Sequence, residues 1–138
     1  MISPTGKGIR NDAAGSGAYG SLRGHGRLHV GKDYLCSPGQ IVVAPFDMVV
    51  KRIAYPYEGK DYSGIIWKTS DMRGKMFYFE PIIAVIGSKV REGTHIGYAQ
   101  DIGNKYGPRM KAHIHFQIDK INPQILEDVS KLVKVLAR

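Results

Sequence analysis

Alternating apolar and polar positions occupy the middle of the 138-residue chain and predict a series of short strands. The runs carry β-branched and aromatic residues, and Pro-Gly, Ala-Pro-Phe-Asp, Glu-Gly and Tyr-Gly-Pro turns separate them. The expected strands span residues 40–45, 47–55, 63–68, 74–80, 95–99 and 111–118. Gly39 and Gly93 each precede an alternating segment, as in a double hairpin that packs two antiparallel sheets together. The pattern therefore predicts a mainly β fold.

The two ends of the chain depart from this strand pattern. Residues 1–22 are rich in Gly, Ala, Ser and Asn, which predicts an irregular arm. Residues 121–138 instead repeat apolar side chains at helical spacing and end in basic residues, which predicts a C-terminal helix. That helix either covers the sheets or docks a partner through its apolar stripe. Residues 23–120, between the two ends, are expected to form the β domain.

The composition supports one domain with a core of its own. Apolar residues make up 43% of the chain, which is enough for a single domain of this length. The aliphatic runs are too short to cross a bilayer. The chain has one cysteine, Cys36, so no disulfide can form within it. This thiol is either buried and inert or takes part in chemistry at a nearby metal loop.

The charge of the chain narrows the range of partners. There are 20 basic and 12 acidic residues, a formal net charge of +8, and they are scattered along the chain. A surface of this sign attracts polyanions, such as anionic wall or glycan polymers and nucleic acid. The sequence contains no zinc-finger, ribonucleoprotein or helix-turn-helix signature, so nucleic acid is not the expected partner.

Two histidines lie one residue apart in the segment MKAHIHFQI, residues 110–118. On a strand, His113 and His115 share one face, while Ile114, Phe116 and Ile118 share the other. Two strand rises separate the imidazoles by about 6 to 7 Å, which suits one metal ligand beside one proton carrier. The same pattern also fits a polar strand face opposite a buried one, so a second cluster has to decide between them.

That second cluster lies upstream in GHGRLHVGKDY, residues 24–34. On a straight strand His29 and Asp33 lie about 13 Å apart, which is too far to bind one ion. A bend at Gly31 would bring the carboxylate back to the imidazole. Two histidine nitrogens and one carboxylate oxygen then leave a fourth position for water, as in catalytic zinc sites. With one cysteine in the chain, a thiolate-rich structural zinc site is excluded.

Four ordered motifs resemble the lysostaphin/LytM-type zinc metallopeptidases, which mostly cut peptide cross-bridges of bacterial cell walls. They are His29-x-x-x-Asp33, the Ala-Pro turn of IVVAPFDMVV, the hairpin VREGTHIGYAQ and His113-x-His115. The match runs from about residue 24 to 118. The details LCSPGQ, APFDM and KMFYFEP are closer still to leukocyte cell-derived chemotaxin, a secreted relative regarded as a non-peptidase. The resemblance implies a small antiparallel β-sandwich, lysostaphin-like with a duplicated hybrid motif.

The resemblance also implies a set of site residues. His29, Asp33 and His115 would bind Zn²⁺, and His113 would be the base that acts on the water activated by the ion. The implied activity is that of a zinc metalloendopeptidase, a hydrolase that cuts peptide cross-links of peptidoglycan.

One position departs from the family pattern. Active members usually carry a further catalytic histidine in a Tyr-x-His-Leu segment, and the corresponding letters here, YFEP, have Glu80 in its place. An ionised carboxylate cannot donate a hydrogen bond to a developing oxyanion. Either another group supplies that donor or the site is catalytically weak. The candidates are Tyr19, His25 and Tyr78, and together with Asn104 they form the expected substrate-binding set.

Two functions are compatible with these residues. The first is a cell-wall lytic endopeptidase of phage or prophage origin, similar to an endolysin. The second is a non-catalytic, zinc-containing binding protein of the chemotaxin type that recognises glycans or a receptor. The retained His113 favours the enzyme, since zinc binding alone does not require it, whereas Glu80 favours the binder. The start of the sequence has no signal-peptide pattern, which predicts synthesis in the cytoplasm and action on the wall after release or delivery, for example in a virion.

Overall fold

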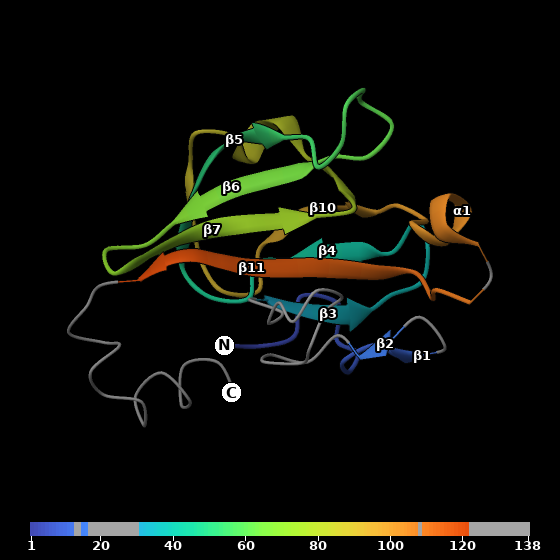
Figure 1. Cartoon of the computed structure of the whole chain (residues 1–138). Coiled ribbons are helices and arrows are strands. Elements are labelled where there is room, and N and C mark those ends of the chain that lie inside the picture. Colours follow the sequence, from blue (N-terminus) through green and yellow to red (C-terminus); the bar gives the residue numbers. More distant parts are fainter. Residues whose placement is uncertain (13–14, 17–30, 108, 122–138) are drawn as a thin grey trace.

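The computed structural model describes residues 1–12, 15–16, 31–107 and 109–121, and strands dominate it (Figure 1). Every strand pair among these residues is antiparallel. The elements in chain order are β1 (Asn11–Asp12), β2 (Gly15–Ser16), β3 (Gly31–Leu35), β4 (Ile41–Val43), β5 (Met48–Ala54), β6 (Gly64–Lys68), β7 (Met72–Phe77), β8 (Phe79–Pro81), the 3-10 helix η2 (Ile83–Val85), β9 (Lys89–Val90), β10 (His95–Ala99), α1 (Gly103–Tyr106) and β11 (His113–Ile121).

The described strands form three sheets. The largest has six strands in the order β3-β11-β7-β6-β5-β9, the second has three in the order β4-β10-β8, and β1 pairs with β2. In Figure 1, β4 lies behind the front layer formed by β6, β7 and β11. Buried side chains of both larger sheets belong to one hydrophobic cluster. The fold is therefore a small, mainly β antiparallel sandwich, as the sequence predicts.

The core lies between the two larger sheets, and aromatic rings fill its centre. Trp67 of β6 stacks on Phe116 of β11 with ring centroids 5.3 Å apart, and Phe46 meets Trp67 edge-on at 5.1 Å. Both Trp67 and Phe116 have no exposed surface. Because side chains alternate along a strand, the residues on either side of Phe116 point to the outer face of the six-stranded sheet.

Two local features differ from the sequence-based expectations. The strand predicted at 74–80 is divided, because Tyr78 has a φ of 78° and separates β7 in the six-stranded sheet from β8 in the three-stranded sheet. Gly31 is the first residue of strand β3 rather than the site of the expected bend. A Cβ at Gly31 would lie 2.1 Å from the carbonyl oxygen of Phe116, so the close approach of β11 requires a glycine there.

The ends of the chain are described only in part. Within the expected arm, Met1 is 4% exposed in the core, and the backbone N–H of Val43 donates to the carbonyl of Pro4. The arm thus packs closely against the sandwich where it is described. The expected C-terminal helix lies outside the described residues, except for Ile121, which ends β11. No helix in the described part of the chain is long and apolar enough to span a membrane.

Candidate metal and catalytic site

The candidate site lies on the outer face of the six-stranded sheet, where β3 and β11 are neighbours. His115 is the antiparallel partner of Asp33. Ile114 and Phe116 point into the core with no exposed surface. The side chains of His113 and His115 therefore share the opposite face, as the alternation of the sequence predicts.

The Asp33 carboxylate is the centre of this site and is 4% exposed. Its Oδ1 lies 2.7 Å from His115 Nδ1. Its Oδ2 accepts hydrogen bonds from Arg10 Nε at 3.2 Å and Nη2 at 3.0 Å, and lies 3.8 Å from His113 Nε2. Arg10 is itself 2% exposed, so the pair is a buried, charge-assisted contact. The guanidinium thereby holds Oδ2 and leaves Oδ1 directed at His115.

The other nitrogen of His115 is held by a side-chain network along β11. Gln117 Nε2 donates to Asp119 Oδ1, so the amide oxygen of Gln117 faces His115 and accepts from its Nε2 at 2.9 Å. A neutral imidazole has one N–H, and this contact uses it. A second proton or a cation is then needed between His115 Nδ1 and the carboxylate of Asp33, since both are otherwise acceptors at 2.7 Å.

His113 carries its ring proton on Nδ1, whereas His115 carries its proton on Nε2. His113 Nδ1 donates to the carbonyl of Lys111 at 2.8 Å, so the electron pair of the neutral ring is on Nε2, the atom nearer Asp33. Burial lowers the pKa of His113, and this outweighs the opposing effect of the Asp33 carboxylate. The ring therefore stays neutral near pH 7, and its Nε2 can accept a proton.

The described residues supply part of the donor set that the sequence predicts for a metal ion. Asp33 Oδ1 and His115 Nδ1 converge and are atoms of the types that bind Zn²⁺. Gln117 orients the imidazole through its other ring nitrogen, as the hydrogen-bond partners of metal-binding histidines do. The third expected ligand, His29, lies outside the described residues. Within the described ranges alone, no three His, Cys, Asp or Glu side chains form a group that could hold an ion.

A tyrosine side chain borders the two histidines. The Tyr78 ring meets the His113 ring edge-on, with centroids 5.4 Å apart, and is tilted toward the His115 ring at 6.5 Å. Its hydroxyl lies 3.0 Å from the Tyr57 hydroxyl. Burial raises the pKa of Tyr78, so its phenol stays protonated and can donate a hydrogen bond.

Further tyrosines extend this border away from the histidines. The Tyr57 hydroxyl is hydrogen-bonded to that of Tyr106 on α1, and the Lys105 ammonium lies 4.4 Å from the centre of the Tyr57 ring. Tyr62 meets both Tyr57 and Tyr78 edge-on. Burial raises the pKa of Tyr106 to about 12. The border is thus a set of neutral phenols with one cation packed on it.

Two of the other predicted residues, Glu80 and Asn104, lie away from this point. Glu80 is exposed on β8, across from Tyr98 in the three-stranded sheet, and Tyr78 is the residue of that segment that contacts His113. The turn of the backbone at Tyr78 separates the two positions. Asn104 lies on α1, exposed, beside a separate shallow hollow. Tyr19 and His25 lie outside the described residues.

Sequence reasoning missed three residues of the site. Gln117 continues the outward alternation of His113 and His115, and that signal could have identified it. Arg10 is 23 residues from its partner Asp33 in an irregular segment, and no spacing rule links them. Tyr57 likewise meets Tyr78 only through the fold.

Comparison with known proteins gives both relatives and structural neighbours, although no protein-family model matches the chain. The chain is 32% identical over 108 residues to leukocyte cell-derived chemotaxin-2 of Bos taurus and 31% identical to that of Mus musculus. Each alignment covers 77% of this chain and 69% of the relative. An uncharacterized metalloprotease of Haemophilus influenzae is 25% identical over 102 residues, which cover 74% of this chain and 22% of that protein.

Two solved structures share the fold. The catalytic domain of the prophage-encoded M23 protein EnpA from Enterococcus faecalis aligns with a TM-score of 0.55 and 22% identity, over 85% of this chain and 88% of that one. The solution structure of lysostaphin aligns with a TM-score of 0.52 and 19% identity, over 94% of this chain and 54% of that one. Both likenesses support the same β-sandwich architecture.

Proposed function

Since the chain belongs to the lysostaphin/LytM-type (M23) metallopeptidase family, we propose that it is a zinc-dependent endopeptidase that hydrolyses peptide cross-links of bacterial peptidoglycan. One observation carries the proposal. Asp33 Oδ1 and His115 Nδ1 converge to 2.7 Å while the Nε2–H of His115 donates to the amide oxygen of Gln117, which is the arrangement that a shared cation would satisfy.

The residues around the proposed ion have separate tasks. Asp33 and His115 would hold it, with His29 as the proposed third ligand. When bound, Zn²⁺ supplies Lewis-acid activation of water and of the scissile carbonyl. Arg10 keeps the second oxygen of Asp33 occupied, so that the carboxylate presents Oδ1 to the ligand position. Gln117 fixes the His115 tautomer that leaves an electron pair on Nδ1.

His113 and Tyr78 would carry the proton transfers and the oxyanion contact. The unprotonated Nε2 of His113 takes a proton from the attacking water and returns it to the leaving amine. The Tyr78 hydroxyl donates to the oxygen that becomes negative, which is the task of the histidine that the family has and this chain lacks. Tyr57, at 3.0 Å, orients that hydroxyl.

Purified peptidoglycan tests the proposal. Zinc-loaded protein is incubated with peptidoglycan from several bacterial types, and released amino groups are counted. We expect amino groups to be released from walls that contain the right cross-link, and His113→Ala protein with the same zinc content to release none. Release by both proteins at one rate would mean that the activity does not come from this site.

A chemotaxin-type binding protein is the second candidate, because the chain shares 32% identity with chemotaxin-2. In that case the ion would stabilise the fold, and the basic surface would hold a glycan or a receptor. The same incubation separates the two. Protein that sediments with every wall tested and releases no amino groups, with or without zinc, would favour the binder.

A further inference from the structure

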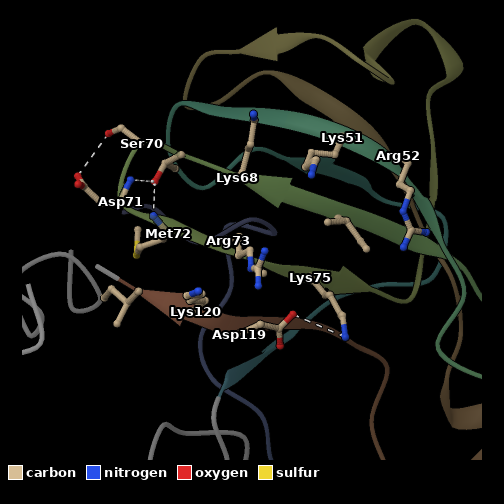
Figure 2. A pocket seen from close by; sticks show the side chains of 14 residues that line it. Lys51, Arg52, Lys68, Ser70, Asp71, Met72, Arg73, Lys75, Asp119 and Lys120 are labelled. Atoms are coloured by element: carbon tan, nitrogen blue, oxygen red, sulfur yellow. Dashed lines mark hydrogen bonds and ion pairs between the residues drawn. The ribbon is translucent and has the colours of Figure 1, made fainter. Parts of the chain in front are cut away.

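A hollow opens on the outer face of the six-stranded sheet, apart from the candidate site, with a volume of about 790 Å³. Figure 2 shows its side chains projecting from neighbouring strands, among them Lys68 of β6, Arg73 and Lys75 of β7, and Lys120 of β11. Together with Lys51 and Arg52 of β5 these form the basic hollow, whose acidic members are Asp71 and Asp119. Six basic and two acidic side chains give it a formal charge of +4.

The basic hollow lies on the same sheet face as the candidate site. Lys75 of β7 is the antiparallel partner of Gln117, which follows His115 by two residues on β11. A continuous row of side-chain contacts joins the two regions. It runs from His115 to Gln117 and from Gln117 to Asp119. It ends in the contact of Asp119 with Lys75 at 3.6 Å, which Figure 2 shows. A ligand that spans about four residues of β11, roughly 13 Å, would reach both.

The lining of the basic hollow indicates the chemistry of its ligand. Apart from the contact of Lys75 with Asp119, its cations are spread over four strands as point charges for anions. Ile66, Met72 and Ile121 add apolar surface between them. Among the described residues that line it none is aromatic, so it lacks the stacking surfaces on which single-stranded nucleic acid bases rest.

We propose that the basic hollow binds the phosphate groups of an anionic polyol-phosphate polymer of the bacterial wall. The choice of polymer rests on the proposed function, since a wall substrate in the candidate site would bring wall-linked polymers onto this same face. Regularly spaced phosphodiesters match cations on neighbouring strands, and the polyol carbons match the apolar patches. The basic hollow would hold the protein on the wall while the site acts on a nearby cross-link.

Binding of purified poly(glycerol phosphate) chains to metal-free protein tests this proposal and needs no hydrolysis. The variant is Lys68→Glu with Arg73→Glu. Its matched control is Lys89→Glu with Arg91→Glu, which changes the net charge equally on exposed residues outside the basic hollow. We expect the first variant to lose about tenfold or more in affinity and to show a shallower salt dependence, and the control to change little.

Two binding results would overturn the proposal. Equal losses in both variants would mean that net charge alone attracts the polymer. A single-stranded oligonucleotide of equal charge that binds as tightly, with the same response to the variants, would identify a general polyanion surface. Release of amino groups from a soluble, uncharged cross-link peptide is measured in parallel. If the peptide is not cut while the polymer binds as predicted, the proposed function fails and the binding site remains.

Discussion

Arg10 and Asp33 form a buried ion pair between the N-terminal segment and strand β3, with Nη2 and Oδ2 3.0 Å apart. The backbone N–H of Arg10 also donates to the carbonyl of Asp33 at 2.7 Å. The same residue thus contacts the main chain and the side chain of Asp33. The segment that the composition marks as an irregular arm is therefore part of the site's supporting structure.

Removing the guanidinium should destabilise the protein strongly. Arg10→Ala takes the cation from a buried carboxylate, which typically costs about 3 to 5 kcal/mol of unfolding free energy. Arg10→Lys keeps the charge but not the two-pronged contact, so we expect an intermediate loss. Urea unfolding of chelator-treated protein measures both, with the exposed Arg52→Ala as the control. A loss no larger than that of the control would mean that the pair does not stabilise the fold.

Zinc content should distinguish the roles of the two histidines of β11. His115→Ala removes a proposed ligand, so zinc content after dialysis should fall from about one per chain to near zero. His113→Ala removes a proton carrier and should leave zinc content nearly unchanged while peptide release stops. Atomic absorption on both variants gives the answer. Equal zinc loss would contradict this division of tasks.

The Tyr78 hydroxyl should matter more than the Glu80 carboxylate. Tyr78→Phe keeps the ring against His113 and removes only the donor, so kcat should fall by roughly 10² to 10³ with little change in KM. Glu80→Gln changes an exposed residue of the other sheet and should leave kcat unchanged. Steady-state rates on a soluble cross-link peptide compare the two. If Glu80→Gln proves the slower enzyme, the donor is not Tyr78.

The thiol of Cys36 should react slowly in the folded protein. Burial raises its pKa to about 11, with a smaller lowering effect of Lys7, so about one thiol in a thousand is ionised at pH 8. Alkylation by iodoacetamide should therefore be far slower than in urea and should rise about tenfold per pH unit up to pH 10.

The same raised pKa also sets a pH dependence of stability. Because the unfolded thiol ionises near pH 8.5 and the folded one only near 11, the folded state keeps the proton in between, and stability falls as pH rises through that window. Alkylation of the folded protein at pH 8 at the rate seen in urea would contradict the raised pKa on which both predictions rest.

Local patterns predict some of these features well. The alternation around Ile114 and Phe116 places His113 and His115 on one face, because the period of two is a property of the strand itself. The pairing of Asp33 with His115 depends on which strands become neighbours, and the sequence suggests it only through the family resemblance. The partner of Asp33 in the arm, Arg10, could not be predicted, since no periodicity connects an irregular segment to a strand.

The break between strands β7 and β8 in the segment YFEP also could not be predicted from the local sequence. Its residues favour a continuous strand, and a positive φ at a tyrosine is rarely adopted. Hydrogen bonds from two other segments hold it there. The N–H of Tyr78 donates to Ser63, and its carbonyl accepts from Gln100. Tertiary contacts thus override a local preference and exchange the expected carboxylate for a phenol at the histidines.

Tyr78 is also the residue at which the chain leaves one sheet of the sandwich and enters the other. Its ring rests on the histidines, whereas the next residue, Phe79, is fully buried between the sheets. A sliding movement of one sheet over the other would therefore act on this corner and displace the Tyr78 ring from the histidines. Under the proposed function, the alignment of Tyr78 with His113 depends on the packing of the whole sandwich, and loosening of its interior would slow hydrolysis before the protein unfolds.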